Sequence, residues 1–130
     1  MIARDTNVVL RLITGDDAAR EAIARRILQR SGVFVSLTVL IEAEWVLRSY
    51  YRWSRAQIAD ALQAFYGLEG ITVERLKWAL WAVDRLRSGA DFADMIHLLV
   101  VADVDAFATF DAQIEKVAGP DAPLPIETLA

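Results

Sequence analysis

The sequence predicts an α/β fold, a three-layer α/β/α sandwich in which helices cover both faces of a central, mainly parallel sheet. Short apolar, β-rich runs such as Val33-Phe34-Val35 alternate with longer stretches of helical periodicity. Strands that are separated by helices pair in parallel through right-handed crossovers. The chain has 130 residues and shows no internal repeat or linker, so residues 1–130 are expected to form one domain.

The predicted strands are short and close to chemically interesting residues. Residues 1–4 form the first strand, with Asp5 at its carboxyl end, and residues 106–110 form a later strand that ends at Asp111. Residues 33–35 and 124–126 are two further strands, while residues 71–73 are either a strand or an extended entry into a helix.

Six helices and a helical turn at residues 113–117 are predicted between these strands, each with apolar residues at three- and four-residue spacing. Thr38 is expected to cap the third helix, Ser54 opens the fourth with Gln57 in a capping box, and Asp91 caps the sixth. The predicted apolar faces are Val8, Val9 and Leu12; Ile23, Ile27 and Leu28; Ile58, Ala61, Leu62 and Phe65; Leu76, Leu80, Val83 and Leu86; and Ile96, Leu99 and Val100.

Composition limits the classes of function. Hydrophobic residues make up 55% of the chain, more than is usual, which predicts either a thick core or a surface for self-association. The four tryptophans fit either location. The net charge of −4 argues against a broad electrostatic surface for nucleic acid, although clustered metal-binding carboxylates would bias that count. The absence of cysteine excludes disulfides and thiolate zinc sites.

The chain carries no visible targeting segment. Its N-terminus lacks a basic start followed by an apolar stretch and a cleavage site, and no apolar run approaches the ~20 residues that span a bilayer. A cytoplasmic protein without a membrane association is therefore expected.

Asp5 and Asp111 are predicted to lie at the carboxyl ends of parallel strands, where sites of open α/β sheets are found. Each carboxylate has a structural alternative, because Asp5 is also well placed to cap a helix and Asp111 to start a turn. Thr109 lies on the same strand face as Asp111 and could hydrogen-bond a carboxylate or a metal-bound water.

Glu42 has neighbours at helical spacing that are largely apolar, among them Val39 and Trp45. A carboxylate in such a stripe must be paired, protonated or bound to a cation, because desolvation of a lone charge is costly. Glu44 has Arg48 four residues later, the spacing of a surface ion pair, and is expected to face solvent.

Asp94 is the better ligand candidate of two acids at the start of the sixth helix, and Asp91 the better cap. His97, one turn later, is expected to be packed or exposed rather than catalytic. Four acids are expected to meet at one edge of the sheet, without histidine or cysteine ligands. Such a site would select a hard cation such as Mg²⁺ or Mn²⁺, and its members are Asp5, Glu42, Asp94 and Asp111.

These segments together resemble the PIN-domain family, and most closely the VapC-type toxins of bacterial toxin–antitoxin pairs. The matching segments are Asp5-Thr6-Asn7, Val39-Leu40-Ile41-Glu42-Ala43-Glu44-Trp45-Val46-Leu47, Asp91-Phe92-Ala93-Asp94 and Thr109-Phe110-Asp111. None of these motifs is specific alone, but their order and spacing agree over nearly the whole chain.

The resemblance implies a PIN-like fold and a Mg²⁺- or Mn²⁺-dependent endoribonuclease with Asp5, Glu42, Asp94 and Asp111 as its acidic site. Asn7 and Thr109 match polar positions near the metal. The resemblance also implies RNA as substrate, a cognate antitoxin that blocks the site, and a homodimer. The alternative is a PIN-like domain that binds RNA or a partner without cleaving.

Two other α/β classes with acidic strand ends fit poorly. A receiver domain needs a lysine at the end of a late strand, and the two lysines are Lys77, inside a predicted helix, and Lys116, after Asp111. A haloacid-dehalogenase-type phosphatase needs Asp-x-Asp after the first strand, where this chain has Asp5-Thr6-Asn7.

Candidate phosphate contacts for an RNA substrate are Arg4, Arg11 and Arg48.

Overall fold

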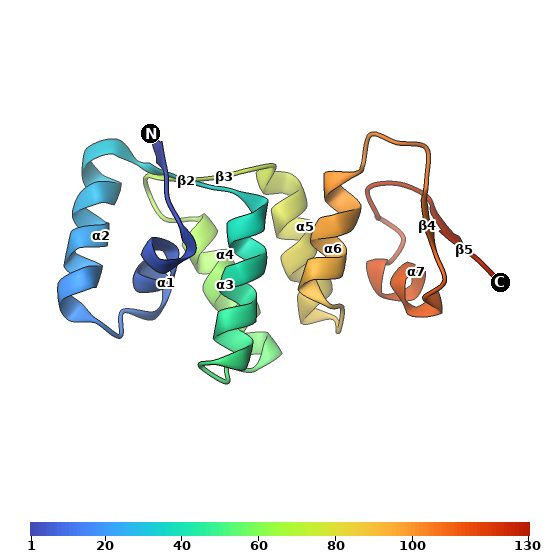
Figure 1. Ribbon diagram of the computed structural model, residues 1–130, viewed down its shortest axis with the longest axis horizontal. Coiled ribbons are helices and arrows are strands. Elements are labelled where there is room, and N and C mark those ends of the chain that lie inside the picture. Colours follow the sequence, from blue (N-terminus) through green and yellow to red (C-terminus); the bar gives the residue numbers. More distant parts are fainter.

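A computed structural model describes residues 1–130 and contains seven helices and five strands (Figure 1). Strands and helices alternate along the chain, which confirms the predicted α/β class. In chain order the elements are β1 (Ile2–Ala3), α1 (Thr6–Thr14), α2 (Ala18–Ser31), β2 (Val33–Val35), α3 (Leu37–Ser49), α4 (Arg55–Tyr66), β3 (Ile71–Val73), α5 (Leu76–Arg87), α6 (Phe92–Val100), β4 (Phe107–Thr109), α7 (Ala112–Ala118) and β5 (Ile126–Thr128).

All strands pair in parallel, but they form two separate sheets. The first has the order β1-β2-β3, with Ile2 opposite Val33 and Val33 opposite Ile71. The second contains only β4 and β5, with Phe107 opposite Ile126. Residues 71–73 are thus a strand, and the last strand begins two residues later than predicted. The parallel pairing that the sequence predicts is present, whereas a continuous central sheet is not.

The two sheets lie in different parts of the molecule. In Figure 1, α5 and α6 lie between the sheet β1-β2-β3 and the pair β4–β5. The C-terminal part attaches to α5, because Arg85 Nε donates to the carbonyl of Val117 at 2.7 Å and the side chains of Ile114 and Leu124 belong to the common core. This attachment fixes where the strand before Asp111 lies.

The core is one cluster of thirty buried apolar residues, and the helices supply most of them. Leu40 and Leu47 of α3, Ile58 and Leu62 of α4 and Met95 of α6 are among its fully buried side chains. Burial of each such side chain stabilises the fold by about 1.5–3 kcal/mol, so the helices rather than the short strands hold the fold together. None of the helices combines the length and the apolar character that a membrane crossing requires.

Two predicted helix caps are confirmed and one is wrong. Ser54 and Gln57 form the capping box of α4, and Asp91 caps α6. The cap of α3 is Ser36 rather than Thr38, because β2 ends at Val35 and the Ser36 hydroxyl accepts a hydrogen bond from the Val39 amide.

Three predicted apolar faces are partly wrong. In α6, Ile96 and Leu99 are buried, but Val100 is 52% exposed. Ile23 of α2 is 50% exposed, while Ala24 and Leu28 are buried against the rest of the fold. Leu76 and Leu80 of α5 are exposed as well, because this helix buries the alanines Ala79 and Ala82 instead. Small side chains permit close helix packing, and hydrophobicity alone does not reveal such a face.

Candidate acidic site

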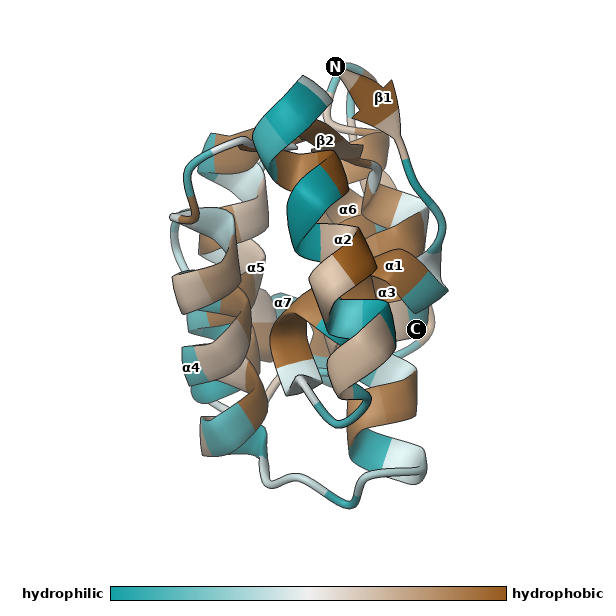
Figure 2. Cartoon of the chain, turned by 90° about the vertical axis from the view of Figure 1, so that its left-hand side faces the viewer, coloured by the Kyte–Doolittle hydropathy of each residue, from teal (hydrophilic) through white to brown (hydrophobic).

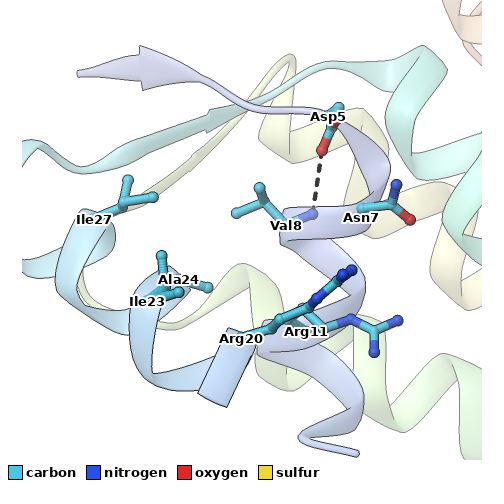
Figure 3. A pocket seen from close by; sticks show the side chains of 8 residues that line it. All are labelled: Asp5, Asn7, Val8, Arg11, Arg20, Ile23, Ala24 and Ile27. Atoms are coloured by element: carbon cyan, nitrogen blue, oxygen red, sulfur yellow. Dashed lines mark hydrogen bonds between the residues drawn. The ribbon is translucent and has the colours of Figure 1, made fainter. Parts of the chain in front are cut away.

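Asp5 lies between β1 and α1 and acts as the N-cap of the helix. Its Oδ1 accepts a hydrogen bond from the Val8 amide at 3.2 Å (Figure 3). The residue is exposed, and its second carboxylate oxygen makes no hydrogen bond within the chain. Asn7, in the first turn of the same helix, is exposed too. The structural role that was open for Asp5 is therefore real, and it leaves one oxygen free for a ligand.

Glu42 and Glu44 have the reverse of their predicted environments. Glu42 is exposed and makes no hydrogen bond or ion pair through its side chain, so the expected desolvation of its carboxylate is wrong. Glu44 is only 3% exposed, and its Oε2 accepts from Arg48 Nε at 2.9 Å. The predicted pair with Arg48 exists, but the expectation that Glu44 faces solvent is wrong. The core of α3 runs along Leu40, Ala43 and Leu47, and Glu44 borders that face.

Asp91 and Asp94 are arranged as predicted at the start of α6. Asp91 Oδ1 accepts from the Asp94 amide at 3.0 Å, so Asp91 is the cap. Asp94 is half-buried, and burial raises the pKa of its carboxyl above the ordinary value. The charges of Asp91 and Asp111 raise this pKa further, whereas His97 lowers it. Like charges therefore gather at the start of α6, and His97, in the last turn of the helix, is exposed.

Asp111 connects β4 to α7 and also acts as a helix cap. Its Oδ1 accepts from the Gln113 amide at 2.9 Å, and its own amide donates to Thr109 Oγ1 at 3.0 Å. Thr109 thus orients the backbone of Asp111 rather than its carboxylate. Phe110, between these two residues, is 78% exposed.

The structure does not bring the four candidate ligands to one point. No three carboxylate or histidine side chains converge closely enough to share a metal ion. The charges of Asp91 and Asp111 both act on Asp94, so these three acids lie near one another. Asp5 and Asp111 follow strands of different sheets, because β4 does not pair with β1. The donor types suit Mg²⁺ or Mn²⁺, and Mg²⁺ is commonly held by one or two carboxylates together with several waters.

Two cavities near these acids were not predicted. One, of about 250 Å³, lies between α1 and α2 beside Asp5 (Figure 3). Its lining residues are Asp5, Asn7, Val8, Arg11, Arg20, Ile23, Ala24 and Ile27. The other, of about 390 Å³, is polar and is bordered by Glu44, Arg48, Arg55 and Asp91. The only feature of the sequence that pointed to this second cavity was the i,i+4 spacing of Glu44 and Arg48.

The three arginines considered as phosphate contacts are held by the protein to different degrees. Arg11 pairs with Asp16 at 2.8 Å, and Arg48 pairs with Glu44 at 2.9 Å. Arg4 precedes Asp5, and its Nε is buried without a hydrogen-bond partner. Of these three arginines, Arg4 alone forms no ion pair within the chain.

Comparison with known proteins adds one finding. The family model described as "PIN domain" matches residues 2–120, which is nearly the whole chain and includes all four candidate acids. A search of curated proteins found no match. PIN domains are generally nucleases that bind divalent metals, and they often act with antitoxin partners and RNA.

Proposed function

Because this chain belongs to the PIN-domain family, we propose that it is a metal-dependent endoribonuclease and the toxin of a VapC-type toxin–antitoxin pair. The observation that carries this proposal is the family match over residues 2–120 together with four acids at the family-like positions. Asp5, Glu42, Asp94 and Asp111 are the proposed site, with Asn7, Asp91 and Thr109 as supporting residues. Single-stranded or looped RNA is the proposed substrate class, because its phosphodiester bonds reach a protein site unhindered.

The accessibility of the acids supports this function. Asp5, Glu42 and Asp111 are exposed, and Asp94 is half-buried, so all four can meet a substrate. Mg²⁺ or Mn²⁺ bound by carboxylates would supply an activated water and would stabilise the charge that develops on the phosphate. The protein's own contribution is orientation, since three of the four acids sit at helix starts whose caps fix the backbone.

A protein partner is supported by the cavity beside Asp5. Its apolar wall includes the exposed Ile23, and Arg11 and Arg20 lie near one another at one end (Figure 3). An antitoxin segment with an apolar face and a carboxylate would fit this chemistry and would cover the entrance to Asp5. The proposed location of the protein is the cytoplasm, where RNA and such a partner are synthesised.

One observation favours the second candidate, a PIN-like domain that binds RNA or a partner without cleaving. Within one copy, no three acidic side chains converge on a common point. Binding without cleavage requires no convergence, so this candidate is retained as the alternative outcome of the test.

The test is cleavage of a mixed RNA pool by the purified protein with Mg²⁺ or Mn²⁺, with EDTA, and with two matched variants. Glu42→Gln removes an exposed acid of the proposed site, and Glu69→Gln removes an exposed acid on the α4–β3 connection. We expect cleavage that requires metal, is lost in Glu42→Gln and persists in Glu69→Gln. Full activity in EDTA would refute the metal dependence. RNA binding without cleavage under every condition would establish the non-catalytic alternative.

A further inference from the structure

The polar cavity, of about 390 Å³, lies where α3, α4, α5 and α6 meet. The last turn of α3 and the first turn of α4, which a short loop joins at the bottom of Figure 2, carry hydrophilic residues. Core side chains such as Ile58 and Phe92 form the apolar wall of the cavity. Its charged lining residues carry both signs and are Glu44, Arg48, Arg55 and Asp91.

Arg48 is held by the protein on one side only. Its Nε donates to Glu44 Oε2 at 2.9 Å, and the side chain of Glu44 is 4% exposed against 50% for Arg48. This contact is the only hydrogen bond or ion pair that the guanidinium of Arg48 makes within the chain. The buried carboxylate therefore fixes the direction of the arginine, while both of its Nη groups stay available to a ligand.

Arg55 is anchored in a similar way, but by backbone carbonyls. Its Nη1 donates to the carbonyl of Leu86 at 2.8 Å and to that of Ala90, in the connection between α5 and α6. The residue is exposed, and its Nε and Nη2 groups make no hydrogen bond within the chain. Two guanidinium groups that are each anchored through one nitrogen thus border the same cavity. Planar guanidinium donors match the oxygens of a phosphate group.

The two acids of the cavity are already engaged by other groups. Glu44 accepts from Arg48, and Asp91 Oδ1 accepts from the Asp94 amide at 3.0 Å. Arg55 and Phe92 are the first residues of α4 and α6, and the amides at a helix start lack partners within the helix and favour an anion. The cavity therefore offers more unpaired donors than acceptors, which suits a phosphate group better than a cation.

The polar cavity is adjacent to part of the proposed acidic site. Asp91 lines the cavity, and Asp94 follows it in the first turn of α6. An RNA strand with one phosphate in the cavity would therefore bring the adjoining nucleotide to Asp94.

We propose that the polar cavity binds a phosphate group of single-stranded RNA, next to the phosphodiester bond that is cleaved. Arg48 and Arg55 bind this phosphate, and Glu44 is a positioning residue that orients Arg48. The choice of RNA as the source of the phosphate rests on the proposed nuclease function, whereas the binding of a phosphate group does not.

RNA binding in EDTA tests this site without any cleavage. Fluorescence anisotropy of a labelled single-stranded RNA gives the Kd of the parent and of the double variant Glu44→Leu with Arg48→Met, which keeps the net charge and leaves no buried charge unpaired. We expect the double variant to bind RNA about tenfold more weakly. The slope of log Kd against log salt concentration should fall by about 0.7 for one lost phosphate contact.

The matched control is Glu21→Leu with Arg25→Met on α2. This pair has the same i,i+4 spacing and the same Nε–Oε distance of 2.9 Å, and its removal also keeps the net charge. The control should bind RNA within about twofold of the parent, because an exposed ion pair contributes little. Equal losses of affinity in the two double variants, or no loss in either, would overturn the proposal.

Glu44→Gln tests the cavity in the opposite direction. Glutamine keeps the size of the side chain and can still accept from Arg48, but it removes the negative charge that opposes a phosphate. RNA should therefore bind about fivefold more tightly than to the parent. An unchanged or weaker affinity would contradict the role given to Glu44 and Arg48.

Inorganic phosphate separates this site from the proposed function. At equal ionic strength, phosphate should raise the Tm of the parent more than chloride does, and this difference should vanish in Glu44→Leu with Arg48→Met. A phosphate-dependent rise together with unchanged RNA affinity in that variant would overturn the assignment to RNA. If the parent binds no RNA, the proposed function fails, and the effect of phosphate on the Tm still decides whether the cavity is a phosphate site.

Discussion

Replacement of Arg48 by methionine should destabilise the fold although Arg48 lies at the surface. The variant keeps a long aliphatic side chain and removes the partner of Glu44, whose side chain is 4% exposed against 50% for Arg48. An exposed ion pair contributes about 0–1 kcal/mol, whereas breaking a buried pair costs about 3–5 kcal/mol. With one buried partner and one half-exposed partner, we expect a loss of about 2 kcal/mol. For a chain of this length, that loss lowers the Tm by about 7 °C.

Urea denaturation at neutral pH, followed by tryptophan fluorescence, measures this loss directly. Arg26→Met is the matched control, because Arg26 is exposed on α2 and forms no ion pair. The double variant Glu44→Leu with Arg48→Met should recover stability relative to Arg48→Met, since no buried charge then remains unpaired. A loss for Arg48→Met below about 0.5 kcal/mol, or equal to that of Arg26→Met, would refute the reasoning about Glu44.

Three further predictions concern caps, pH and helix faces. Asp5→Asn should keep the stability within about 0.5 kcal/mol of the parent because asparagine caps equally well, whereas Asp5→Ala should lose about 1 kcal/mol; thermal melts in metal-free buffer compare the two. The hydrogen bond from Tyr51 to Asp16 lowers the pKa of Asp16, so the stabilisation that this bond gives is present above the ordinary carboxyl pKa and is lost as pH falls through the folded-state value. Tyr51→Phe should therefore destabilise the fold at neutral pH. In denaturation series at decreasing pH, the free energies of unfolding of this variant and of the parent should converge. Leu28→Ala should cost about 2–3 kcal/mol and Ile23→Ala under about 1 kcal/mol in the same assay, and equal losses would contradict the observed burial of α2.

Local structure was largely predictable because its signals are local. The capping box at Ser54 and the cap at Asp91 each depend on residues within one helical turn, and both are present as predicted. Strand β2 occurs where the sequence predicts it, and residues 71–73, for which a strand and an extended entry were both open, form β3. The α/β class follows from this alternation alone.

The buried face of a helix is harder to predict when the helix is apolar on most sides. Residues of α3 are hydrophobic on nearly every side, so periodicity could not decide whether Glu42 or Glu44 borders the core. The two residues are about 200° apart around the helix axis in ideal geometry, so burying one exposes the other. The choice is made by packing against α1, α4 and α6, which no local pattern encodes.

The relative position of the four acids was the least predictable feature, because it depends on which strand β4 pairs with. A strand as short as β4 can pair with any compatible free edge, and the difference in free energy between such pairings resides in the contacts of the whole C-terminal part. Here those contacts include the hydrogen bond from Arg85 to Val117, far in sequence from both Asp5 and Asp111. The position of Asp111 relative to Asp5 is therefore decided by tertiary structure, which no local sequence pattern encodes.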